Sequence, residues 1–132
     1  MSLFDKIFKS SQDVAKEEIV EVPWHPLTRI EQLEEAEKES FNRRVGIFKH
    51  STRCGISRMV LRNFESKYPS IADDQQKIYF LDLLSNRDIS NEIESRYGVR
   101  HESPQFLVLK DGKVVRHDSH HGIKAEALID EN

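Results

Sequence analysis

Cys54 is the residue of this sequence best suited to covalent chemistry, and it is the only cysteine in the chain. It lies in the stretch KHSTRCGISRMV, residues 49–60, shortly after an apolar run that ends at Ile47 and Phe48. Apolar residues at helical spacing follow it. The pattern therefore predicts a strand, a short turn, a cysteine and a helix start, which is the layout of a redox site. Such sites usually carry a second cysteine three residues later, and Ser57 occupies that position.

The predicted position of Cys54 favours the thiolate form of its side chain. At the first turn of a helix, unpaired amides and the positive end of the helix dipole stabilise a thiolate over a thiol. Arg53 and Arg58 flank the site and could add a favourable charge. The Ser57 hydroxyl could donate a hydrogen bond to the sulfur, and Gly55 leaves room for another sulfur to approach.

We expect Cys54 to lie in an exposed turn, because its neighbours are small or polar. These neighbours are Ser51, Thr52, Arg53, Gly55 and Ser57. We expect Thr52, like Arg53, Gly55 and Ser57, to support the thiolate or the substrate. The alternative is a buried and inert cysteine, since free cysteine is among the most buried residue types.

Serine at position 57 limits the chemistry that Cys54 can perform. A dithiol site resolves its mixed disulfide internally, whereas a monothiol site keeps its partner until an outside thiol attacks. The chemistry open to Cys54 is to attack a mixed disulfide, carry the small thiol away and pass it on.

The string HESPQ, residues 101–105, is a second candidate element of the site. A cis Ser103–Pro104 bond would suit a bend that brings this segment close to the thiol. The backbone of Ser103 could then pair with an incoming substrate strand. The alternative is an ordinary proline at the start of a strand.

Histidines in the string HDSHH, residues 117–121, invite a metal interpretation that we do not favour. His117 and His121 would share a face only on a helix, and Gly122 indicates a loop. No second cysteine or acid–histidine motif supports a metal site, so we expect no metal. It is more plausible that one of these histidines, or His50, reaches the thiol pocket.

Several elements must position these residues. Residues 1–18 are expected to be an N-terminal extension, either a docked helix or a frayed tail, and residues 19–132 one domain. Ile19–Trp24 is predicted to be a strand closed by Pro23 and Pro26, and Thr28 and Glu31 a capping box for a helix that runs to about Ser40. Residues 44–49 are predicted to be a second strand, and the helix after Cys54 to stop at Tyr68-Pro69.

The second half of the chain predicts a further strand, a helix and a hairpin. Residues 77–84 are almost continuously apolar, as in a strand covered on both faces. A helix should begin near residues 85–88 and end at Gly98, and Asp111-Gly112 should join two hairpin strands. Residues 123–129 are predicted to be a closing helix.

The predicted order is β-α-β-α-β-α-β-β-α. Strands joined by helices should lie parallel, and the terminal hairpin should be antiparallel. The fold class is therefore α/β, with a mixed central β-sheet and helices on both faces.

Composition excludes several functional classes. The chain has 132 residues, 20 basic against 23 acidic residues and a net charge of −3. Charges of both signs are scattered, so there is no basic stripe for nucleic acid. One cysteine excludes an internal disulfide, and no apolar run approaches the ~20 residues needed to cross a bilayer. We expect a cytoplasmic monomer with no membrane association and no tightly bound cofactor.

The strings KHSTRCGIS, GVRHESPQ and HDSHHGI resemble the YtxJ family of monothiol bacilliredoxins. The similarity runs from about Trp24 to the C-terminus. It implies a thioredoxin-like fold and a role with bacillithiol, the low-molecular-weight thiol that some bacteria use in place of glutathione. The implied reaction removes bacillithiol from S-bacillithiolated client proteins, with bacillithiol as co-substrate.

The resemblance also implies roles for individual residues. Cys54 matches the redox cysteine of the family, and Pro104 matches the cis-proline of the fold. The family commonly has the string TCPIS, where this chain has RCGIS with Arg53 and Gly55. Arg53, Arg58 and Arg100 could attract the malate carboxylates of bacillithiol.

Two other functions remain open at this stage. The first is a peroxidase-like site, although Thr52 lies two residues before the cysteine where peroxiredoxins have threonine three before. The second is a non-catalytic adaptor or stress-related binding module, with the N-terminal apolar residues as its docking surface. These residues are Leu3, Phe4, Ile7 and Phe8.

Overall fold

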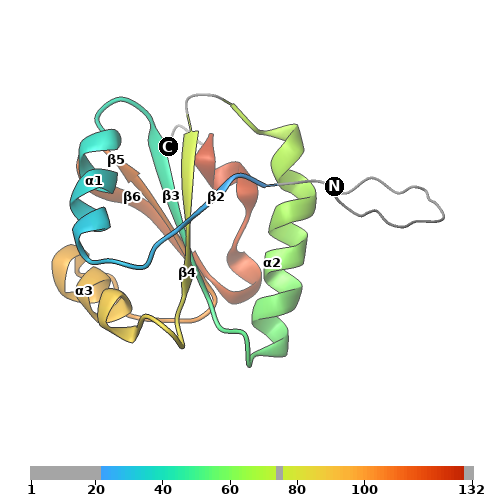
Figure 1. The fold of residues 1–132 in the computed structure, drawn as a ribbon. Helices are drawn as coiled ribbons and strands as arrows, with labels where there is room; N and C mark the ends of the chain where they lie inside the picture. Colours follow the sequence, from blue (N-terminus) through green and yellow to red (C-terminus); the bar gives the residue numbers. More distant parts are fainter. Residues whose placement is uncertain (1–21, 74–75, 130–132) are drawn as a thin grey trace, which may run out of the picture.

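A five-stranded sheet forms the centre of the computed structural model, which describes residues 22–73 and 76–129 (Figure 1). Its strands are β2 (Trp24–Pro26), β3 (Arg44–His50), β4 (Gln76–Asp82), β5 (Gln105–Lys110) and β6 (Lys113–Ser119), in the spatial order β2-β4-β3-β5-β6. Strands β2, β4 and β3 are parallel, while β5 and β6 are antiparallel to their neighbours. The predicted mixed central sheet is confirmed.

Helices cover both faces of this sheet. They are α1 (Glu31–Glu39), α2 (Gly55–Lys67) and α3 (Arg87–Tyr97). Figure 1 shows α1 and α3 on one side of the sheet and α2 on the other. Two separate clusters of buried residues fill the two layers: one holds Leu33, Ile89 and Ile93 of α1 and α3, and the other holds Val60 and Phe64 of α2.

Alternating side chains of β3 supply both layers, since successive residues of a strand point to opposite faces. Val45 and Ile47 join the α1–α3 layer, and Phe48 joins the α2 layer. In β4, the predicted doubly covered strand, Ile78, Tyr79 and Leu81 are buried. The central strand pair therefore fixes the end of β3, from which the chain turns toward Cys54.

The direction of β5 differs from the prediction that strands joined by helices lie parallel. Strand β5 follows α3, yet it runs antiparallel to β3. The reason is that α3 does not carry the chain back along the sheet. Gln105 pairs with Lys49, so β5 begins at the end of the sheet where β3 and β4 finish. Figure 1 shows α3 beside that end.

The helix ends are partly as predicted. The predicted Thr28–Glu31 capping box is wrong: the Gln32 side chain accepts hydrogen bonds from the backbone amides of Thr28 and Arg29, at 2.8 and 2.9 Å. Gln32 is long enough to reach back over its own first turn, which leaves the Thr28 hydroxyl unused as a cap. Gly98 ends α3 with φ 67°, the left-handed conformation predicted for it.

The hairpin turn is also confirmed. Asp111 and Gly112 join β5 to β6 with φ values of 54° and 78°, which a two-residue hairpin of this twist requires at both positions.

The first and last elements of the described part differ from the prediction. The first described strand is β2, later than the predicted Ile19–Trp24, and it includes Pro26; residues 19–21 lie outside the described part. The predicted helix over residues 123–129 is replaced by short 3₁₀ turns, His120–Gly122 and Ala125–Leu128, whose apolar side chains join the α2 layer. The predicted extension, residues 1–18, also lies outside the described part.

No helix within residues 22–73 and 76–129 is both long and apolar enough to span a bilayer.

Candidate functional site

Cys54 lies at the junction of β3 and α2, as the sequence predicts. Strand β3 ends at His50, and the Cys54 amide donates to the Ser51 carbonyl at 3.2 Å, which closes the turn between them. Cys54 is the N-cap of α2, with extended backbone angles, and its carbonyl accepts from the Arg58 amide at 3.1 Å. The side chain is half-buried, so it is less exposed than expected. The thiol is held at the positive end of a thirteen-residue helix.

Thr52, Arg53 and Gly55 are all exposed around this turn. Arg58 reaches back from α2, and its Nη1 donates to the Thr52 carbonyl at 3.1 Å. A Cβ built on Gly55 would meet only Arg58 Nη2, at 3.8 Å, so the space beside the cysteine is open. Thr52 therefore contributes its backbone carbonyl to the turn. Arg58 is the basic side chain that a hydrogen bond holds over the turn.

Ser57 does not hold the thiol, contrary to the prediction. Its side chain is fully buried; its Oγ accepts from the Ser51 amide at 3.1 Å and lies 2.8 Å from Nδ1 of His50. Among the described residues, nothing donates a hydrogen bond to the Cys54 sulfur. The hydroxyl points into the molecule because Ser57 belongs to the buried face of α2, with Val60 and Phe64.

His50 lies directly before this turn and contacts Ser57, which follows it. It is buried at the end of β3, and its ring lies against Phe80 at a centroid distance of 5.5 Å. Burial lowers the pKa of His50, Asp82 opposes this, and Arg58 adds to it, so the ring is neutral at physiological pH. A neutral ring suits this buried position, and its Nδ1 can form the hydrogen bond with the Ser57 hydroxyl in either tautomer.

The Ser103–Pro104 peptide is cis, as predicted, and it lies beside the same end of β3. Since Lys49 pairs with Gln105, the register brings Pro104 to the level of His50. The Pro104 carbonyl accepts from the His120 amide at 3.0 Å. Ser103 has no backbone hydrogen bond to another described residue, and its buried hydroxyl is also without a partner. Ser103 thus presents an unsatisfied backbone next to the turn of Cys54.

The histidines of the HDSHH string lie on β6 and in the turn after it, and this turn meets the cis-proline segment through the His120 amide, which donates to the Pro104 carbonyl. His117 lies on β6, and His120 and His121 form the short turn after it, all three exposed. Within the described part of the chain, no three His, Cys, Asp or Glu side chains group together in a way that could hold a metal ion.

Sequence reasoning missed a polar pair on the α1–α3 face of this end of the sheet. Lys49 is fully buried, and its Nζ lies 3.3 Å from Nδ1 of His101, which is also 3.0 Å from the Ser90 hydroxyl. The signal was present: Lys49 continues the two-residue spacing of Val45 and Ile47, which predicts an inward-facing side chain.

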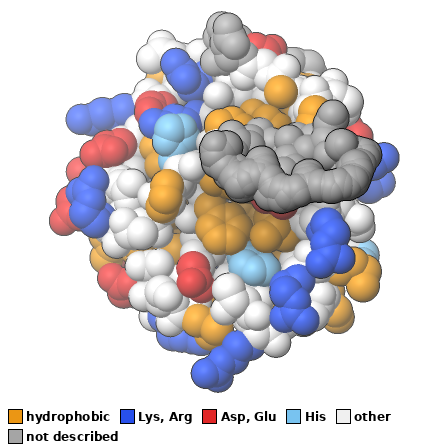
Figure 2. Space-filling model, turned by 45° about the vertical axis from the view of Figure 1, so that its right-hand side comes forward, with side chains coloured by type: hydrophobic (Ala, Val, Ile, Leu, Met, Phe, Trp, Pro, Cys, Tyr) orange, Lys and Arg blue, Asp and Glu red, His pale blue; other side chains and the backbone are white. Residues whose placement is uncertain are grey.

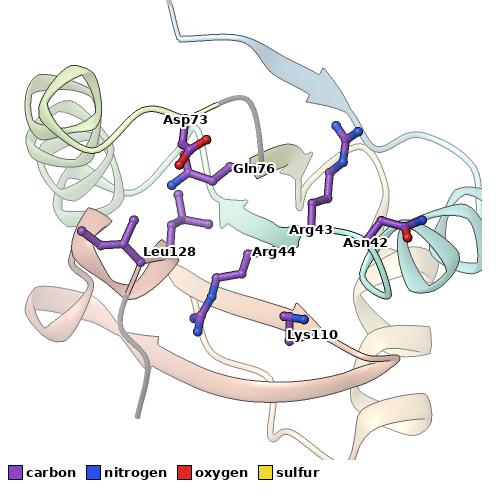
Figure 3. Close-up of a pocket in the computed structure, with 8 residues that line it drawn as sticks. Asn42, Arg43, Arg44, Asp73, Gln76, Lys110 and Leu128 are labelled. Atoms are coloured by element: carbon purple, nitrogen blue, oxygen red, sulfur yellow. The ribbon is translucent and has the colours of Figure 1, made fainter.

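A separate hollow of about 360 Å³ lies at the opposite end of the sheet, where β3 and β4 begin. Figure 3 shows the side chains of Arg43 and Arg44, neighbours in the sequence, pointing in opposite directions at this hollow. The rest of the polar lining consists of Asn42, Asp73, Gln76 and Lys110. None of the residues around Cys54 contributes to this hollow.

The model of the family described as monothiol bacilliredoxin BrxC matches residues 25–128. The chain belongs to this family. The match spans every described helix and nearly every strand, including the Cys54 turn and the Ser103–Pro104 bend. The bacilliredoxin therefore has a thiol redox function.

Solved structures agree with the fold of the bacilliredoxin. A protein described as a proposed oxidoreductase with a thioredoxin fold is 28% identical, with a TM-score of 0.68, and the match covers 81% of this chain and 91% of the other. A thioredoxin of Malassezia sympodialis, Mala s 13, is 19% identical with a TM-score of 0.62, covering 86% and 90%. A thioredoxin of Fasciola hepatica is 23% identical with a TM-score of 0.57, covering 72% and 85%. The fold is thioredoxin-like, as expected.

Proposed function

We propose that this protein removes bacillithiol from S-bacillithiolated client proteins through a mixed disulfide on Cys54. The observation that carries the proposal is the half-buried thiol at the start of α2, with a buried serine where a dithiol enzyme has its second cysteine. The family match supports this interpretation.

The proposed reaction exchanges one disulfide for another without net oxidation. The Cys54 thiolate attacks the bacillithiol sulfur of the client's mixed disulfide, and the client cysteine leaves as a thiolate. The new bond joins Cys54 to bacillithiol. Ser57 cannot break it, because a hydroxyl does not replace a thiol in this exchange. A second thiol from solution must therefore attack the bacillithiol sulfur and release Cys54.

Protein clients fit the surface around Cys54. Ile56 and Met59 project from the first turns of α2 and are 46% and 50% exposed, and Leu84, just after β4, is 41% exposed. Figure 2 shows a hydrophobic area in the middle of one face, with basic side chains along its lower right border. Ser103 adds an unsatisfied backbone with which an extended client segment could pair.

Arg58 suits recognition of the anionic groups of bacillithiol. Its guanidinium donates one hydrogen bond to the Thr52 carbonyl and has no carboxylate partner among the described residues. Its remaining N–H groups are therefore available to a carboxylate close to the thiol. Arg53 is exposed on the same turn and could contribute.

Intact mass spectrometry tests the proposal. The purified protein is incubated with a bacillithiolated client, and Cys54→Ala serves as the matched variant. We expect a mass gain of one bacillithiol on the wild type alone, with an equal loss from the client. If a folded wild type with a free thiol takes up nothing, the proposal is wrong, and a non-catalytic adaptor role replaces it.

A copy of the same client that carries 2-mercaptoethanol, a thiol without a carboxylate, tests the role of Arg58. We expect Arg58→Gln to slow transfer from the bacillithiolated client more than from this second client. An equal loss on both clients would contradict the role of Arg58 in recognition.

A further inference from the structure

Lys49 is a buried cation with no function in the exchange reaction as described above. None of its surface is exposed, and among the described residues no carboxylate lies within 4.0 Å of its Nζ. Burying an unpaired charge is costly, so such residues are rare in a protein interior. Its position at the Cys54 end of β3 makes a structural role alone a poor explanation.

The contacts of Lys49 lead to one segment of the chain, His101–Pro104. Its Nζ lies 3.3 Å from Nδ1 of His101, and Ser90 of α3 lies 3.0 Å from the same nitrogen. On the neighbouring strand, Lys49 is paired with Gln105, whose side-chain amide donates to the Arg100 carbonyl at 2.9 Å.

These contacts fix the segment at both of its ends. The Gln105 side chain closes a loop from residue 100 to residue 105, and the Lys49 contact holds the His101 ring inside it. Ser103, whose backbone is unsatisfied, lies between these two anchors.

The charges around the pair allow its hydrogen bond to be strong only over a limited pH range. Burial lowers the pKa of Lys49 to about 8, with Glu94 of α3 opposing the shift. Burial also lowers the pKa of His101; Lys49 and Arg87 act in the same direction, and Glu94 and Glu102 oppose them. Leu81 and Gln105, the strand neighbours of Lys49, add no charge. A charged Lys49 therefore faces a neutral His101 near neutral pH.

We infer that Lys49 is a positioning residue for the exchange reaction: by donating to Nδ1 of His101 it holds the His101–Pro104 segment in the conformation that receives the substrate. The donation is charge-assisted while Lys49 is protonated and His101 is neutral. It weakens when Lys49 loses its proton and is lost when His101 gains one. Lys49 acts through His101 and does not touch the reacting sulfurs. The inference rests on the proposed exchange at Cys54.

The rate of bacillithiol release from a modified client, measured between about pH 6 and about pH 9.5, tests this role. Lys49→Met keeps the length of the side chain and removes the charge. Lys110→Met is the matched control, because Lys110 lies at the far end of β5 and pairs with Asp111. We expect the ratio of wild-type to Lys49→Met rates to be about tenfold near neutral pH and to fall toward one as the pH rises above about 8. The ratio for Lys110→Met should stay near one throughout.

Stability and NMR measurements separate this role from a structural one. Lys49→Met should be at least as stable as the wild type, because an apolar side chain replaces a buried charge. In the wild type, the ¹⁵N signal of His101 Nδ1 should change with a midpoint near pH 8, which also tests the inference if the variant fails to fold.

A ratio for Lys49→Met that does not vary with pH, or a His101 signal that stays constant between about pH 7 and about pH 9.5, would overturn the inference. An inactive wild type would instead count against the proposed function, while the NMR titration would still decide the Lys49–His101 link.

Discussion

The Ser57 hydroxyl lies 2.8 Å from Nδ1 of His50, and both side chains are buried where the chain passes from β3 to α2. The same hydroxyl oxygen accepts from the Ser51 amide. Three residues on the two sides of the Cys54 turn are thus joined by one oxygen atom. Serine at this position replaces a second thiol and also holds the turn that presents the first.

Ser57→Ala should destabilise the protein. The substitution leaves the buried His50 ring and the Ser51 amide without their partner, which costs about 1–3 kcal/mol. Urea unfolding should show the midpoint moving to lower urea with an unchanged slope. Ser66→Ala is the control, because Ser66 is an exposed serine of the same helix that bonds only to the Asn63 carbonyl. Equal effects of the two substitutions would contradict the bridging role of Ser57.

Gly55→Pro should stabilise the protein. Gly55 is the first residue of α2, where a missing N–H costs nothing. Cys54, with φ −105° and ψ 120°, already has the extended conformation that a residue before proline requires. The gain should be about 0.4–1 kcal/mol, because proline restricts the unfolded chain. Thermal unfolding measures it, and a lower midpoint would show that the turn does not accept proline.

Gly46→Ala should be strongly destabilising, because a Cβ there would lie 2.6 Å from Cζ of Phe106 and 3.1 Å from Cδ2 of Leu128. The backbone of β3 is fixed by neighbouring strands on both sides, so the ring must move. Overpacking of this kind costs about 1–3 kcal/mol. Gly122→Ala is the control, since a Cβ there would meet nothing within 4 Å. Denaturant unfolding of the two variants should differ clearly.

The stability of the protein should rise between about pH 8 and pH 10.5. The pKa of Lys49 is lowered from 10.5 to about 8 in the folded state, so over this range the unfolded chain binds the proton and the folded chain does not. Folding in this range releases a proton, so it becomes more favourable as the pH rises. The shift corresponds to about 3 kcal/mol. Unfolding free energies of wild type and Lys49→Met against pH should show a rise from this group in the wild type only.

The central part of the fold could be predicted from sequence because local patterns and packing agree there. The apolar run in β4, the Asp111-Gly112 turn and Gly98 at the end of α3 each identify their element without tertiary information. The cysteine at the start of α2 was located for the same reason, since it lies between an apolar strand and a helical pattern.

The missed features depend on the arrangement of distant segments. The direction of β5 depends on the end of the sheet at which the chain leaves α3, and the local sequence pattern does not encode this. The partner of the Ser57 hydroxyl is decided by the buried face of α2 and the position of His50. Lys49 and His101 are separated by more than fifty residues and meet only because β3 and β5 are neighbours.

The outer strands of the described sheet carry features that hinder its growth by addition of further strands. Strand β2 has three residues and includes Pro26, which has no N–H to donate. Strand β6 places charged side chains along its length, and its ladder with β5 is irregular at Val108 and Leu109. Short, charged, irregular edges disfavour edge-to-edge association of copies of the chain. An incoming client segment therefore has more to gain by pairing at Ser103 than at either border of the sheet, which would direct strand pairing toward Cys54 and away from aggregation.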